Sequence, residues 1–297
     1  MELRTLRYFH ILAQEGSLSN AARVLGITTP TLSRQLAALE DELGRQLYTR
    51  SSKGIELTEH GIMLARYAEE LTDLADRVVE EISLPERSVK GTVRLGVGET
   101  KLVGFLGRAM ARVQVGYPEI TFALYSGNTV DLLDNLARGM YDFMLECEVK
   151  PRAGFNTLRL PMKDIWGIVT RRDSALGALS KIGPRDLIGQ PLIASRQGTT
   201  TEPLSSWLAD VQDKMHVAAT YNLPLSGKFL VEQGLGSMFT YEGIVEAGPD
   251  SPLVFIPLDP PIESVQGIVW RKAMLSKPAQ VFLDCLMDIL DEDQAQS

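Results

Sequence analysis

Short hydroxyl groups and one guanidinium share a face of a helix that is predicted near the start of the chain. At about 100° per residue, Thr29, Ser33, Arg34 and Ala37 fall on the same side of that helix. Arginine can hold guanine through two hydrogen bonds, and a hydroxyl can bond to several bases. The face therefore suits the reading of base edges in DNA, and its candidate contacts are Thr29, Pro30, Thr31, Ser33 and Arg34.

Three short helical segments separated by glycine turns would position this face. Gly16 and Gly26 end the first two segments, because glycine readily adopts the left-handed conformation of a helix end. Ser17 can cap the second segment, and Thr28 or Thr29 can cap the third. The third segment carries an apolar stripe at helical spacing, formed by Leu32, Leu36, Leu39 and Leu43. The pattern predicts a helix-turn-helix.

Residues 46–57 indicate two short strands around a polar tip, which together would form a wing. From that tip, Arg50 and Lys53 can reach a phosphate group or a minor groove. The alternative is that each is a solvated surface charge, as most lysines and arginines are. Both residues stay candidate DNA contacts.

One unbroken helical pattern covers residues 58–84. Its apolar positions recur in steps of three and four, which is the spacing of a coiled-coil seam. The spacing predicts a pair of helices from two chains, and the alternative is a helix that lies on its own domain. Beyond Gly61, the predicted dimerisation residues are Leu64, Ala68, Leu71, Ala75, Val78 and Ile82.

Short β-like runs alternate with helical patterns after Pro85 and the charged residues 86–90. The strand-helix order over residues 92–145 predicts a parallel sheet with right-handed crossovers. Further strands are expected at 165–170, 192–194, 217–219, 237–239 and 265–271, followed by a helix at 278–290.

Other features give no sign of catalysis. Residues 96–101 have the spacing of neither a P-loop nor a dinucleotide fingerprint. The three histidines show no metal-binding spacing, and two isolated cysteines cannot form a disulfide framework or a zinc site. We therefore expect no enzyme, no cofactor and no metal. The alternative is a ligand-binding or enzymatic α/β protein whose N-terminal domain serves only in assembly.

The charge of the chain is distributed unevenly. The 297 residues carry a net charge of −8, but residues 1–57 hold seven basic and six acidic residues. An acidic body with a near-neutral head suits a protein that touches nucleic acid through one module. No run approaches the roughly 20 apolar residues of a membrane span, and the start lacks a signal-peptide pattern. We expect a cytoplasmic protein without membrane contact.

Residues 1–60 resemble the winged helix-turn-helix of LysR-type transcriptional regulators. The matching segments include Leu6-Arg7-Tyr8-Phe9, Gly16-Ser17-Leu18-Ser19, Ala21-Ala22, Leu39-Glu40, Leu43-Gly44 and Leu57-Thr58-Glu59-His60-Gly61. One position departs from the family, because Thr29 stands where Gln usually precedes the proline of the recognition helix. Gln can bond adenine through two hydrogen bonds, whereas Thr offers one hydroxyl and a methyl group.

The resemblance implies a fold of three parts. These are a winged helix-turn-helix domain at 1–60, a dimerising linker helix and hinge at 61–90, and an α/β effector domain at 91–297. The effector domain would be bilobal and similar to periplasmic binding proteins, with lobe I at about 91–162 and 268–297 and lobe II at about 163–267. The implied partners are double-stranded DNA with an interrupted inverted repeat, a second copy in a homodimer or a dimer of dimers, a small-molecule effector and RNA polymerase.

Effectors of this family are expected between the lobes, where strands end and helix N-termini present free N–H groups. The alternative for any one of the hydroxyl residues in these turns is a simple helix cap. The candidate effector-binding residues are Glu99, Thr100, Ser126, Thr129, Cys147, Thr199 and Thr200.

The charge of the effector can be inferred from the turn after residues 142–145. Some relatives that sense aromatic acids have an arginine there, whereas this chain continues Glu146-Cys147-Glu148, with Glu99 on a neighbouring turn. Because these carboxylates would repel an acid, we expect a neutral or cationic polar effector, or one bound by N–H groups alone. Arg196 or Lys228, reaching in from lobe II, would instead restore anion binding.

Overall fold

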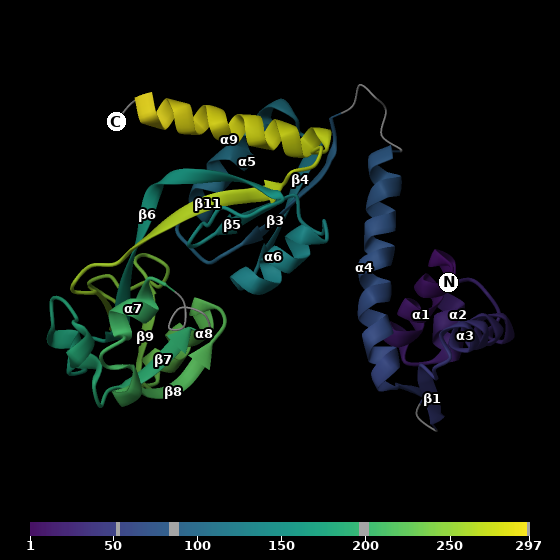
Figure 1. The fold of residues 1–297 in the computed structure, drawn as a ribbon, viewed down its shortest axis with the longest axis horizontal. Helices are drawn as coiled ribbons and strands as arrows, with labels where there is room; N and C mark the ends of the chain where they lie inside the picture. The colour runs from purple at the N-terminus through teal and green to yellow at the C-terminus, as the bar shows by residue number, and fades with distance from the viewer. Residues whose placement is uncertain (52–53, 83–88, 196–201, 296–297) are drawn as a thin grey trace. The chain divides into compact units, whose positions relative to one another are not determined.

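The computed structural model describes residues 1–51, 54–82, 89–195 and 202–295 (Figure 1). By its internal contacts the chain divides into two compact units, Met1–Glu86 and Arg87–Ser297. Within the described ranges, no helix is both long enough and apolar enough to cross a membrane.

The first unit consists of helices and one two-stranded hairpin. Its elements are α1 (Leu3–Glu15), α2 (Leu18–Val24), α3 (Thr29–Leu43), β1 (Tyr48–Ser51), β2 (Gly54–Leu57) and α4 (Glu59–Ile82). The hairpin is antiparallel, with Tyr48 opposite Leu57. Phe9, Leu32 and Leu36 are fully buried in its core, and Leu39 is buried as well, as predicted for the apolar stripe of α3. The fourth predicted member, Leu43, is exposed at the end of the helix.

Local signals fix both ends of α3. Thr28 is the N-cap, and its Oγ1 accepts a hydrogen bond from the backbone N–H of Thr31 at 3.3 Å. Pro30 lies in the first turn, where its missing N–H removes no helical hydrogen bond. Gly44 ends the helix with φ 62°, a conformation that glycine adopts without strain.

The second unit is built on one sheet of nine strands, counted over the described residues. The strands are β3 (Gly91–Val97), β4 (Ile120–Ser126), β5 (Phe143–Glu146), β6 (Phe155–Arg171), β7 (Pro191–Ser195), β8 (His216–Tyr221), β9 (Ser237–Tyr241), β10 (Leu253–Pro257) and β11 (Glu263–Arg271). The helices are α5 (Val103–Gly116), α6 (Thr129–Ala137), α7 (Leu204–Leu208), α8 (Pro224–Glu232) and α9 (Lys277–Ala295).

The order of these strands defines two lobes. The sheet runs β4-β3-β5-β11-β6-β9-β7-β8, with β10 beside β6. In lobe I, β3 pairs in parallel with β4 and β5, and in lobe II, β7 pairs in parallel with β8 and β9. The antiparallel strands β6 and β11 connect the lobes. The sequence predicts only the second half of β6, because Pro161 interrupts the strand pattern of the first half.

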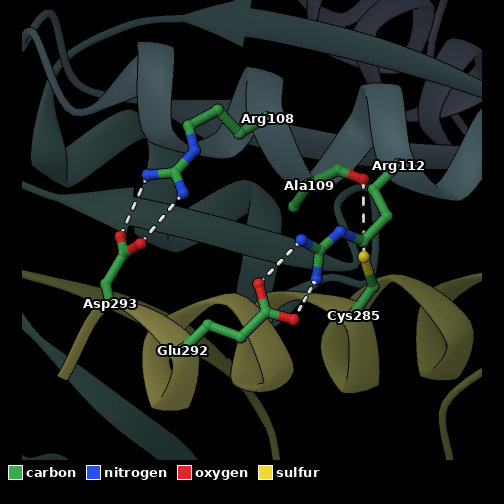
Figure 2. Close-up of polar contacts among 6 residues, drawn as sticks. All are labelled: Arg108, Ala109, Arg112, Cys285, Glu292 and Asp293. Atoms are coloured by element: carbon green, nitrogen blue, oxygen red, sulfur yellow. Dashed lines mark hydrogen bonds and ion pairs between the residues drawn. The ribbon is translucent and has the colours of Figure 1, made fainter. Parts of the chain in front are cut away.

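Helices cover both faces of the lobe I sheet (Figure 1). Phe143 and Leu145 pack with residues of α5 and α9, whereas Met144 packs on the other face with Leu132 of α6. Figure 2 shows how α9 is fastened to α5 by two forked ion pairs. Arg108 donates to both carboxylate oxygens of Asp293 at 2.9 Å, and Arg112 donates to both of Glu292 at 2.8 Å.

Candidate functional site

The predicted DNA-reading residues lie at the start of α3. The side chains of Thr29, Pro30, Thr31 and Arg34 are exposed, and that of Ser33 is half-buried. The leucine stripe on the opposite side of the helix holds this face outward. The structure therefore brings together a proline, short hydroxyls and a guanidinium at the end of a helix, where base edges could be reached.

The wing is tied to this face by one hydrogen bond. Arg50 of β1 donates from Nη2 to Oγ of Ser33 at 2.8 Å. This bond places the wing arginine beside the recognition helix, and both of its residues are candidate DNA contacts. The other wing candidate, Lys53, lies outside the described residues.

The first half of α4 packs on its own domain. Ala68 is 0% exposed and Thr72 is buried, while Leu64 packs against the core of the unit. Arg7 of α1 pairs with Asp76 of α4 at 2.5 Å, which extends the contact along the helix. Ala68 therefore faces the core of its own unit, and its place in a dimer seam stays a prediction. A spacing of three and four residues does not distinguish packing on the same domain from packing on a partner.

A different stripe of α4 is apolar and exposed. At about 100° per residue its members share the helix face that points away from α1, and they are Met63, Tyr67, Leu71, Leu74 and Val78. Of the predicted seam, Leu71 and Val78 belong to this stripe, Ile82 is exposed at its border, and Ala75 is half-buried. The stripe is the surface of the first unit that a second chain could cover.

A pocket of about 460 Å³ lies between the lobes of the second unit. Strand ends from lobe I and lobe II line it: residues 98–99 after β3, 127–130 after β4, 146–148 at β5, Ser195 of β7 and 222–224 after β8. Trp166, Thr240 and Tyr241 line it from the sheet. Ligands of α/β sheets bind at the carboxyl ends of parallel strands, and this pocket has that position.

The predicted effector residues are only partly brought together. Glu99, Thr129 and Cys147 line the pocket, whereas Ser126 is not among its lining residues. Thr100 is buried and donates its hydroxyl proton to a carboxylate oxygen of Asp164. Thr199 and Thr200 lie outside the described residues, as does Arg196. Lys228 pairs with Glu232 in its own helix at 3.4 Å and does not line the pocket.

Sequence reasoning missed the aromatic wall of the pocket and also Arg152, which lines it. Trp166 and Tyr241 come from β6 and β9, and no local pattern connects two residues so far apart. Arg152 follows β5 and donates to both carboxylate oxygens of Glu146, at 2.5 and 2.6 Å. In the sequence, Glu146 and Glu148 at the end of one strand indicate an acidic pocket. Arg152, six residues after Glu146, could have been recognised as a candidate ion-pair partner for it.

Burial shifts the pKa of three acidic groups in or beside the pocket. Burial raises the pKa of the Cys147 thiol, and the nearby carboxylates of Asp164, Glu148 and Glu146 raise it further. The thiol therefore stays protonated, which makes it a poor nucleophile. Burial also raises the pKa of Glu148 and of Asp164. Among the described residues, no group of three His, Cys, Asp or Glu side chains could hold a metal ion.

Two family models match the chain. The model described as "Bacterial regulatory helix-turn-helix protein, lysR family" matches residues 3–62, and the model "LysR substrate binding domain" matches residues 86–291. Together they cover the elements that carry the recognition helix and the pocket.

Curated proteins similar to this chain are named as transcriptional regulators. The HTH-type transcriptional regulator YbhD of Escherichia coli is 27% identical over 99% of this chain and 93% of its own length. The HTH-type transcriptional activator CmpR of Synechocystis is 27% identical over 96% of each chain. BenM of Acinetobacter baylyi is 33% identical over 62% of this chain and 57% of its own.

Among solved structures, CbnR, described as a LysR family transcriptional regulator, has the same fold. It superposes with a TM-score of 0.74 over 98% of this chain and 99% of its own, at 18% identity. The structure of CbnR with its target DNA superposes with a TM-score of 0.73, also at 18% identity.

Proposed function

This chain belongs to the LysR family of DNA-binding transcriptional regulators, and on that premise we propose that it binds an interrupted inverted repeat as a homodimer under the control of a small molecule. The recognition helix and the wing contact DNA, through Thr29, Pro30, Thr31, Ser33, Arg34, Arg50 and Lys53. The effector occupies the pocket between the lobes. Its binding favours one of two conformations that differ in how the two heads are held.

One observation supports the DNA half of the proposal above all others. The polar face of α3 is exposed while the opposite face is buried in the core, and Arg50 of the wing lies within hydrogen-bonding distance of it. A helix that displays hydroxyls and an arginine in this way can enter a major groove. The exposed apolar stripe of α4 is the surface through which we propose that two chains pair, which gives the two heads of a dimer.

The test of DNA recognition is selection of bound duplexes from a random pool by the full-length protein, followed by footprinting of the enriched sequence. We expect two protected half-sites related by an inverted repeat, about one helical turn or a multiple of it apart. Protection of a single half-site, or no enrichment over the starting pool, would contradict the proposal.

The effector half of the proposal rests on the pocket. Strand ends from both lobes meet around about 460 Å³, a volume in the range that small-molecule sites have. A compound that raises the melting temperature of the full chain should also change the footprint. Thr129→Val, in the pocket wall, should weaken that response, whereas Thr157→Val, outside it, should not.

We propose further that the protein works in the cytoplasm, assembles as a dimer of dimers and contacts RNA polymerase, as the family resemblance implies. We also propose that the DNA-binding domain ends near residue 60 and that the linker helix and hinge end near residue 90. Lobe II would then extend from about residue 163 to about residue 267. We also propose that the pocket binds its ligand without transforming it; the raised pKa of the Cys147 thiol, which disfavours attack by that group, is consistent with this. Light scattering of the purified protein tests the assembly, and mass spectrometry of a recovered ligand tests for turnover.

A further inference from the structure

Glu148, in the pocket wall, has an unpartnered buried carboxylate oxygen and an uncommon backbone conformation. One carboxylate oxygen, Oε1, is buried and has no hydrogen-bond partner. The backbone at Glu148 has φ 151°, and among the described residues it is the one non-glycine position with a positive φ. Positive φ is costly for a residue with a side chain, and such strain gathers at binding sites. Glu148 itself lines the pocket, so a carboxylate with one unpartnered oxygen lies in the pocket wall.

The pocket around Glu148 holds more acidic than basic side chains, and the charge of Lys150 only partly offsets the burial of the Glu148 carboxyl. Glu99, Glu146 and Glu202 also line the pocket, against Lys150 and Arg152. Arg152 is engaged by both oxygens of Glu146, and Lys150 is exposed to solvent. The pocket is therefore acidic, and an anionic ligand would be repelled from this side.

An aromatic wall adjoins the acidic side. The rings of Trp166 and Tyr241 are 4.3 Å apart between centroids and tilted by 55°. Trp166 is fixed because its Nε1 donates to Oγ of Ser264 at 2.8 Å. Both residues line the pocket. Aromatic faces attract cations and also pack against apolar groups, so this wall suits the body of an organic cation.

We propose that the effector of this pocket carries an ammonium group, bound by the carboxylate of Glu148, on an apolar or aromatic body that packs against Trp166 and Tyr241. The inference rests on the proposed function of the pocket as the effector site. An ammonium group offers three donors and no acceptor, which matches a carboxylate oxygen that lacks a donor. Burial is the main cause of the raised pKa of Glu148, and a bound cation would remove that cost.

The test is calorimetry on the full-length protein with amine and acid probes that are similar in size but opposite in charge. 2-Phenylethylamine and 1,4-diaminobutane are compared with 3-phenylpropanoate and succinate. We expect at least one amine to bind and neither acid to bind more tightly than the amines. Binding of an acid in preference to the amines, or failure of both amines to bind at millimolar concentration, overturns the proposal.

Two substitutions identify the group that holds the cation. Glu148→Gln keeps the shape of the side chain but removes its charge, and we expect it to weaken amine binding by about 10- to 100-fold. Glu263→Gln removes an exposed carboxylate that pairs with Lys163 outside the pocket, and should leave amine binding unchanged. Equal amine binding by Glu148→Gln and the parent overturns the assignment of Glu148. Circular dichroism and a melting curve check that each variant is folded, and Glu148→Asp, which keeps the charge, should bind more tightly than Glu148→Gln.

The outcomes separate this inference from the proposed function. If an acid binds and alters the DNA footprint, the pocket is an effector site and the ammonium inference fails alone. If an amine binds through Glu148 but no ligand alters the footprint, the ligand class stands and the regulatory function fails.

Discussion

Arg50 of the wing and Ser33 of the recognition helix are hydrogen-bonded to each other at 2.8 Å, although both are candidate contacts for DNA. The bond holds the wing arginine beside the face of α3 before any duplex arrives. Ser33 is half-buried, and its hydroxyl already accepts this hydrogen bond from Arg50. A base or phosphate that takes up Ser33 must replace this bond or share it.

The first prediction concerns base recognition. Arg34→Ala should reduce the affinity for the selected DNA site by about 1–3 kcal/mol, because it removes an exposed guanidinium from the recognition face. Its effect on random DNA should be smaller. Arg185→Ala, on the surface of the second unit, serves as the control for loss of one positive charge. Fluorescence anisotropy at fixed salt measures the DNA affinity of both variants. Equal affinity of Arg34→Ala and the parent would show that Arg34 does not contact the DNA and would contradict the assignment of α3 as the recognition helix.

The second prediction concerns Ser33 itself. Ser33→Ala frees Arg50 from the recognition helix, so the loss of one hydroxyl contact is offset by an arginine that can reach a phosphate. We therefore expect a smaller loss of specific affinity than for Arg34→Ala and a steeper salt dependence of binding. Titrations at several salt concentrations measure the slope. An unchanged slope would mean that Arg50 does not contact a phosphate after release.

The third prediction separates dimerisation from folding. Leu71→Glu puts a charge on the exposed stripe of α4 and should dissociate the linker-mediated dimer while leaving the melting temperature of the first unit unchanged. Ala68→Glu should instead destabilise that unit, because the site is fully buried and cannot solvate a carboxylate. Ile62→Glu, exposed but outside the stripe, is the matched control. Sedimentation of a fragment covering residues 1–86 avoids association through the second unit, and an intact Leu71→Glu dimer would disprove the stripe.

The fourth prediction concerns the ion pair of Glu146 and Arg152. The carboxylate is almost fully buried, while the guanidinium is partly exposed. Glu146→Gln should cost about 1–3 kcal/mol of stability, below the usual cost of breaking a fully buried pair because solvent can reach Arg152. It also frees a cation in the pocket, so we expect carboxylates to bind better. Urea unfolding and calorimetry with succinate measure the two effects, and no gain in succinate affinity would refute the second.

The fifth prediction is a pH dependence of the ligand-free protein. Burial raises the folded-state pKa of Glu148 and Asp164, so the protonated form of each is favoured by folding. Their contribution to stability is complete below the unfolded-state pKa near 4.5 and 3.8, and it is lost as pH rises through the higher folded-state pKa. Glu148→Gln should flatten part of this decline. Urea unfolding between pH 4 and 8 tests it, and identical profiles for the variant and the parent would contradict it.

The sequence predicts the elements better than their partners. Leu32, Leu36 and Leu39 share a helical face, and that period alone establishes α3 and its buried side. The same kind of period in α4 does not say what the face packs on: it predicts Ala68 in a seam between chains, and Ala68 is fully buried within its own chain. Strand ends predict where the pocket lies, and Glu99, Thr129 and Cys147 are found there. By the same sequence criterion Thr100 is also predicted to line the pocket. In the structure its hydroxyl instead donates to Asp164 of β6, a contact that no local sequence pattern reveals.

The ion pairs and core contacts between α5 and α9 have a consequence for biosynthesis. Phe282 and Leu286 of α9 belong to a core that also contains residues of β3, α5, β4 and β5, all of which precede them in the chain. In the sheet, β11 stands between β5 and β6. A ribosome makes these late elements long after β3 and β5 have emerged, at roughly 5–20 residues per second. The core of lobe I therefore cannot be completed until translation is nearly finished. The core of the first unit, in contrast, is formed by residues within the first 65 of the chain, which are made early. The DNA-binding head can thus fold on the nascent chain before the ligand pocket exists, and a prematurely terminated product would keep the head but lack regulation.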